Sequence, residues 1–178
     1  TRTFLYFGRI LYYKGVDVLI KAANILTDQK IDFNLVIAGY SENFDYYSSM
    51  LKNNPNVETK IYKITKEELD KIFLNSNYFV APYREVTQSG PLIISYNYKM
   101  IPIASDLNGF KEYIENGKTG FLFENENPIS LAKCMKDILD LSDIQKNEIH
   151  SNIQKFKDKE FNIKSIAKSY LEFFESIL

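Results

Sequence analysis

The sequence has few of the residues that disulfides and zinc sites need. Its 178 residues include one cysteine, Cys134, and one histidine, His150. An intrachain disulfide and a zinc site built from Cys and His ligands are therefore excluded. This composition fits a reducing compartment, so we expect a cytoplasmic protein. We also expect Cys134 to be a small buried side chain and His150 a solvated helix residue.

Long apolar runs and a strong net charge are also missing. The sequence has no run of eighteen apolar residues and no basic-then-apolar leader, so it predicts neither a membrane span nor a signal peptide. Lys and Arg number 22 against 23 Asp and Glu, so no overall field favours nucleic acid or an anionic membrane. Because the chain begins at Thr1 without Met and reaches a strand-like run almost at once, we expect a piece of a longer protein.

Two alternating patterns run through the first two thirds of the chain. Short β-branched and aromatic runs alternate with stretches of helical period, which predicts βαβ units and a mainly parallel sheet. The expected strands lie near 3–7, 33–38, 57–62, 78–82, 101–105 and 120–123. Helices are expected between the first two strands, around 42–52, after a capping box at Thr65–Glu68, and from Ser89-Gly90-Pro91 onward.

Beyond Phe123 only helical patterns follow, over about 128–140, 143–156 and 162–177. No repeat, low-complexity tract or linker divides the chain. The sequence therefore predicts one α/β domain over 1–178. We expect a Rossmann-like, doubly wound parallel sheet of about six strands over 1–125, with a helical tail over 126–178.

Candidate anion-binding residues stand at the expected strand ends. Gly8-Arg9 follows the first strand and Lys14-Gly15 precedes the next helix, which is where an open parallel sheet binds ligands. Arg9 and Lys14 form either a diphosphate clamp or part of an ordinary surface loop. Residues 87–90 either hold an anion at a helix start or simply cap that helix. Gly39-Tyr40 is either a turn or a place where a nucleotide approaches the backbone.

The order and spacing of these segments resemble the C-terminal domain of family 4 glycosyltransferases across essentially the whole chain. The matching segments are Gly8-Arg9, Lys14-Gly15, Ile37-Ala38-Gly39, Ala81-Pro82-Tyr83-Arg84, Thr87-Gln88-Ser89-Gly90, Ile103-Ala104-Ser105-Asp106 and Gly117-Lys118-Thr119-Gly120-Phe121. The resemblance implies one lobe of a GT-B fold, which binds a UDP- or GDP-sugar or another nucleotide-diphosphate sugar. The acceptor would be held by an N-terminal lobe that precedes Thr1.

The resemblance also implies roles for single residues. Arg9 and Lys14 would neutralise the diphosphate as the nucleotide leaves, and Glu85 would contact the donor sugar, with Val86 as the alternative alignment. Nucleotide and phosphate contacts would come from Gly8, Gly39, Tyr40, Ile64, Thr87, Gln88, Ser89 and Gly90. The resemblance implies no metal or other cofactor.

The sequence departs from the family pattern at several places, two of which bear on the site. The family's second glutamate, which holds the ribose, aligns with Ile93 or Ile94, and its Gly-Gly with Asn108-Gly109. Asn108-Gly109 predicts a tight turn, in a segment over 105–122 that indicates a loop, a helix, a turn and a strand. The chain instead resembles the branch that reads Tyr-Arg-x-x-Thr-Gln-Ser-Gly. Tyr12-Tyr13 either covers the donor or packs on the missing lobe.

The resemblance implies half of a retaining enzyme that transfers sugar to a saccharide or lipid-linked acceptor, as in polysaccharide or glycolipid assembly. The isolated domain would be inactive, and the full-length protein could associate peripherally with a membrane. Epimerases and phosphorylases share the fold but explain the Thr-Gln-Ser-Gly segment less well. A non-catalytic domain that binds or senses a nucleotide sugar remains the alternative.

Overall fold

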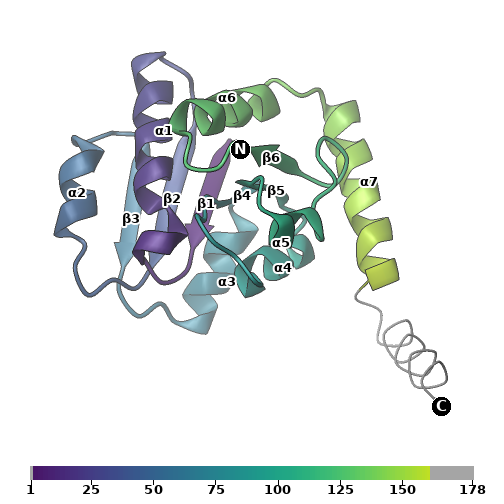
Figure 1. Ribbon diagram of the computed structural model, residues 1–178, viewed down its shortest axis with the longest axis horizontal. Coiled ribbons are helices and arrows are strands. Elements are labelled where there is room, and N and C mark those ends of the chain that lie inside the picture. Colours follow the sequence, from purple (N-terminus) through teal and green to yellow (C-terminus); the bar gives the residue numbers. More distant parts are fainter. Residues whose placement is uncertain (1, 161–178) are drawn as a thin grey trace.

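The computed structural model describes residues 2–160 and shows a six-stranded parallel sheet with helices on both faces (Figure 1). The strand order is β3-β2-β1-β4-β5-β6. The strands are β1 (Thr3–Phe7), β2 (Asn34–Gly39), β3 (Val57–Ile61), β4 (Tyr78–Ala81), β5 (Ile101–Ser105) and β6 (Phe121–Phe123). The predicted Rossmann-like α/β architecture is thereby confirmed. The helix expected over 162–177 lies outside the described residues.

The helices divide between the two faces of the sheet. They are α1 (Val16–Asp28), α2 (Asp45–Leu51), α3 (Lys66–Leu74), α4 (Gly90–Asn97), α5 (Asn108–Lys111), α6 (Pro128–Leu139) and α7 (Asp143–Glu160), with a 3₁₀ turn, η1, at Tyr12–Lys14. Helix α1 packs between α2 and α6, while α3, α4 and α5 lie on the opposite face (Figure 1). Strands covered on both faces are apolar throughout, and Phe4, Leu5 and Tyr6 of β1 are accordingly fully buried.

Two local predictions need correction. Asn108-Gly109 begins the short helix α5 and is not only a tight turn. The Thr65 hydroxyl accepts a hydrogen bond from the Glu68 amide at 3.2 Å, as a capping box requires. The Glu68 carboxylate, however, accepts a hydrogen bond from the Tyr62 hydroxyl instead of returning to Thr65. The side chain of Glu68 therefore ties α3 to the end of β3.

The lone cysteine and the lone histidine both lie in the helical tail. Cys134 was expected to be buried; the residue is half-buried and packs against the core, and burial raises the pKa of its thiol to about 12. His150 is half-buried, and its Nδ1 is buried without a hydrogen-bond partner among the described residues. Burial lowers its pKa, so the prediction of a solvated side chain is wrong. None of the described helices is long and apolar enough to span a membrane.

Candidate functional site

The strand order reverses at β1, which pairs with β2 on one side and with β4 on the other. Helix α1 leaves β1 toward one face of the sheet, and α4 leaves β4 toward the other. Loops that diverge in this way open a crevice beyond the carboxyl ends of the strands, where open α/β sheets bind their ligands. The loops after β1, β2, β3 and β4 surround this crevice, and the predicted site residues lie on them.

The loop after β1 is held against the loop after β2. The Gly8 amide donates to the Ala38 carbonyl at 3.1 Å, and the Ile10 amide donates to the Tyr40 carbonyl at 2.8 Å. The buried Tyr6 hydroxyl donates to the Arg9 carbonyl at 2.8 Å. These bonds fix the backbone at Arg9, while its side chain remains exposed.

Close contact between these two loops requires glycine at Gly39. A Cβ at this position would lie 1.9 Å from the Gly8 carbonyl oxygen, and the residue has φ +145°. The two backbones therefore meet without side chains between them. The arrangement leaves an open cavity of about 320 Å³ beyond the strand ends, lined by Phe7, Gly8, Arg9, Gly39, Tyr40, Tyr62, Lys63 and Ile64.

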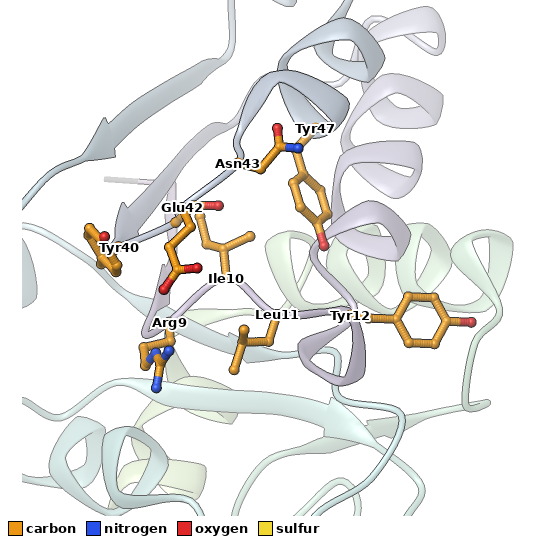
Figure 2. A pocket seen from close by; sticks show the side chains of 9 residues that line it. Arg9, Ile10, Leu11, Tyr12, Tyr40, Glu42, Asn43 and Tyr47 are labelled. Carbon is orange, nitrogen blue, oxygen red and sulfur yellow. The ribbon is translucent and has the colours of Figure 1, made fainter.

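Arg9 also borders a second cavity, of about 260 Å³, between the loops after β1 and β2 (Figure 2). Its walls are formed by Arg9, Ile10, Leu11, Tyr12, Tyr40, Ser41, Glu42, Asn43 and Tyr47. Figure 2 shows the Glu42 carboxylate on the Arg9 side of this cavity and the Tyr12 ring pointing away from it. The Tyr12 side chain is 73% exposed. Arg9 thus lies between two cavities beyond the carboxyl end of β1.

Lys14 lies on the β4 side of the switch point. Its Nζ is 3.6 Å from the centroid of the buried Tyr83 ring and 4.9 Å from that of Tyr13, a cation–π arrangement. Burial lowers the pKa of the ammonium group. A third cavity, of about 290 Å³, is lined by Tyr13, Lys14, Glu85, Val86, Thr87 and Gln88.

Helix α4 begins beside this third cavity. Ser89 is buried at its N-cap, with its hydroxyl 3.4 Å from the Tyr83 hydroxyl, and Gly90 is the exposed first residue of the helix. Pro91 in the first turn has no amide hydrogen to leave unsatisfied. The free amides at this end favour an anion.

The structure brings the predicted residues together in two places. Gly8, Arg9, Gly39, Tyr40 and Ile64 line one cavity, and Lys14, Glu85, Thr87 and Gln88 line the other.

Arg84 is the residue whose importance the sequence did not reveal. Its guanidinium donates to both carboxylate oxygens of Asp17, at 2.9 and 2.8 Å, and to Glu126 at 2.9 Å. These partners raise its pKa further, the Asp17 hydrogen bond most of all. Arg84 was visible in the matching segment, but Asp17 stands 67 positions earlier, so no short motif contains the pair.

Among the described residues, no group of three or more His, Cys, Asp or Glu side chains is arranged to hold a metal ion. Of the residues that line the two cavities at the crevice, Arg9, Lys14 and Lys63 carry positive charge. The free amides at the start of α4 add a partial positive charge.

Curated relatives match almost the whole chain. A glycogen synthase of Thermodesulfovibrio yellowstonii is 24% identical over 184 residues, which cover 97% of this chain and 35% of that protein. An uncharacterized glycosyltransferase of Methanocaldococcus jannaschii is 24% identical over 176 residues, which cover 96% of this chain and 44% of that protein. The chain thus spans less than half the length of these relatives.

Solved structures share the fold. The C-terminal domain of a glycosyl transferase group 1 family protein, LpcC, of Francisella tularensis has a TM-score of 0.77 at 18% identity, covering 90% of this chain and 86% of that one. Anabaena HepE in complex with UDP and glucose has a TM-score of 0.77 at 19% identity, covering 98% of this chain and 48% of that one. These neighbours confirm the fold expected of one GT-B lobe. The family model described as "Glycosyl transferases group 1" matches residues 1–156, and the chain belongs to that family.

Proposed function

We propose that this chain is the donor-binding lobe of a retaining glycosyltransferase. The enzyme moves a sugar from a nucleotide-diphosphate sugar to a saccharide or lipid-linked acceptor. The observation that carries the proposal is the position of Arg9 and Lys14 on either side of the switch point, each at a cavity formed by loops that match the family's motifs. This is the place where a doubly wound sheet binds a nucleotide.

The proposed chemistry is charge stabilisation of a departing nucleotide. The cavity beside Gly8, Tyr40 and Ile64 takes the nucleoside, and the diphosphate extends from Arg9 toward Lys14 and the start of α4. Negative charge on the diphosphate grows as the bond to the sugar breaks, so fixed cations there stabilise the transition state more than the ground state. Glu85, at the rim of the Lys14 cavity, contacts the donor sugar.

We propose UDP as the first nucleotide to test. HepE was solved with UDP and glucose, and Staphylococcus aureus TarM, whose TM-score is 0.84 at 21% identity over 97% of this chain and 35% of that one, was solved with UDP and fondaparinux. We assign the acceptor to the part of the full-length enzyme that the relatives have beyond the match. A saccharide acceptor is in keeping with the fondaparinux in the TarM complex.

Calorimetric titration of residues 1–178 tests the donor site. UDP, GDP and ADP should each be compared with the corresponding monophosphate. We expect a clear preference for a diphosphate, because the second phosphate reaches the Lys14 side of the crevice. Equal binding of diphosphate and monophosphate at millimolar concentration would contradict the proposal.

Retention needs its own experiment. The full-length enzyme should be supplied with its donor and an acceptor, and the anomeric configuration of the new linkage should be read by NMR. We expect the configuration of the donor to be kept. A product of opposite configuration would exclude a retaining mechanism while leaving the donor site intact.

A non-catalytic nucleotide-sugar sensor is the second candidate. The feature that favours it is isoleucine at both positions where the family's ribose-binding glutamate would align. Ile93 is half-buried and Ile94 is 41% exposed, and neither can accept a hydrogen bond from a ribose. Donor binding by the full-length protein without turnover, across a panel of saccharide and lipid-linked acceptors, would favour the sensor.

A further inference from the structure

Arg84 belongs to the loop after β4, yet its contacts lie on η1 and α1 across the switch point. Its Nη1 donates to the Tyr12 carbonyl at 2.7 Å, and its backbone amide donates to the Tyr13 carbonyl at 2.7 Å. The guanidinium also lies over the Tyr12 ring, 4.2 Å from the centroid. Arg84 thus holds the two carbonyl groups that directly precede Lys14.

The ion pair that anchors Arg84 is shielded from water. The side chains of Arg84 and Asp17 are only 11% and 9% exposed. Burial alone would raise the pKa of the Asp17 carboxyl, but the hydrogen bonds and charge of Arg84 outweigh it and lower that pKa. A bidentate pair of this kind has a fixed geometry that lysine cannot reproduce.

Two further contacts press the same turn onto the β4 loop. A Cβ at Gly15 would lie 1.8 Å from the Pro82 carbonyl oxygen, so the backbone after Lys14 touches the end of β4. The Lys14 ammonium rests on the Tyr83 ring. The backbone of Lys14 is therefore fixed on both sides, before it by Arg84 and after it by Gly15.

We propose that Arg84 is a positioning residue, which holds Lys14 where its ammonium meets the second phosphate of the donor. Arg84 itself does not touch the donor, because its guanidinium is occupied by Asp17, Glu126 and the Tyr12 carbonyl. The inference rests on the proposed function. It adds that the response of the site to its diphosphate depends on an ion pair between α1 and the loop after β4.

The test compares UDP with UMP binding by calorimetry on residues 1–178. Arg84→Lys keeps the positive charge but loses the planar guanidinium that donates two hydrogen bonds to Asp17. Asp17→Asn removes the negative charge that anchors Arg84 and keeps the shape of the side chain. We expect either change to weaken UDP binding roughly tenfold, the scale of one charge-assisted hydrogen bond, and to leave UMP binding within about twofold. Lys133→Ala is the matched control, because it breaks an exposed ion pair with Asp137 on α6.

A double variant separates positioning from a general loss of structure. If Arg84 acts through Lys14, then Arg84→Lys added to Lys14→Ala should weaken UDP binding no further than Lys14→Ala alone. Denaturant midpoints identify any variant that fails to fold. If Arg84→Lys fails to fold, the milder Asp17→Asn replaces it, alone and in combination with Lys14→Ala.

The outcomes are distinct. Full additivity of the two losses, or parent-like UDP binding by both Arg84→Lys and Asp17→Asn, would overturn the inference and leave the donor site standing. A parent chain that binds UDP no better than UMP would overturn the proposed function and the inference with it. A selective loss of UDP binding that disappears in the Lys14→Ala background supports both.

Discussion

Among single residues, the two cations Arg9 and Lys14 test the candidate site most directly. Arg9→Ala and Lys14→Ala should each weaken UDP binding by about 1.5–3 kcal/mol, because each removes a charge-assisted hydrogen bond to phosphate. Arg9 is exposed, so its loss should shift the free energy of unfolding by less than about 0.5 kcal/mol. Titration and urea denaturation of the same samples measure both quantities. Lys136→Ala, an exposed change on α6, serves as the control.

Gly39 tests the contact between the loops after β1 and β2. Gly39→Ala should destabilise the fold by about 3 kcal/mol, because the new Cβ meets the Gly8 carbonyl oxygen and the φ of +145° is strained for alanine. It should also weaken UDP binding by reshaping the cavity beside Arg9. For stability, Gly90→Ala is the control, since a Cβ there meets no atom within 4 Å. Equal stability of the two variants in urea would show that the contact is not needed.

Asp17 predicts how the free energy of unfolding changes at acid pH. Its folded-state pKa is lowered from 3.8, so its ionised form stabilises the fold above that value. This contribution is lost as the pH falls through the lower folded-state pKa. The stability advantage of the parent over Asp17→Asn should therefore be steady above about pH 5 and shrink below it. Urea unfolding at pH 7, 5 and 3 measures the trend, with exposed Asp28→Asn as the control. A pH-independent difference would contradict this assignment.

At the level of elements, periodicity and turn residues were enough to predict all six strands to within about one residue of their observed bounds. Buried parallel strands are short apolar runs, and here a polar, glycine or proline residue stands within two positions of each strand end. A helix was expected between the loop after Ser105 and the turn at Gly117, but Asn108-Gly109 was assigned to a turn, because Asn-Gly in isolation indicates one. The Arg84–Asp17 pair escaped prediction because contacts between distant segments leave no local pattern.

Helix α6 tests whether capping matters in the tail. The Asn127 side chain accepts hydrogen bonds from the amides of Ile129 and Ser130, both at 3.0 Å. Asn127→Ala should therefore cost about 1 kcal/mol of stability. Asn147→Ala, on the exposed surface of α7, should be neutral or slightly stabilising because alanine favours a helix. Thermal unfolding of the two variants decides the point, and an identical midpoint would rule out a capping role.

Across the whole molecule, the order of motifs predicted which residues approach the crevice but not how they divide among cavities. Arg9 and Lys14 line different cavities, since the η1 turn places Lys14 on the Tyr83 ring while Arg9 stays beside Gly39. That division depends on the 3₁₀ turn and on the ring packing beneath it. Neither is visible as a spacing in the sequence.

Residues 1–178 alone should show no sugar transfer and at most slow donor hydrolysis. Transfer aligns two substrates in a closed site that excludes water, and the chain spans only 35% to 44% of the first two relatives. Incubation with radiolabelled donor and added acceptor, followed by product chromatography, measures both reactions. The full-length enzyme is the positive control. Efficient transfer by the isolated chain would show that this lobe holds the acceptor as well.

Each of the two outer strands of the described sheet has a feature that disfavours pairing with a strand of another molecule. Strand β3 carries an ion pair between Lys60 and Glu58 at 2.8 Å, and β6 is only three residues long. Charged or very short outer strands are poor templates for pairing with a strand from another molecule. The β3 and β6 edges thus resist edge-to-edge aggregation.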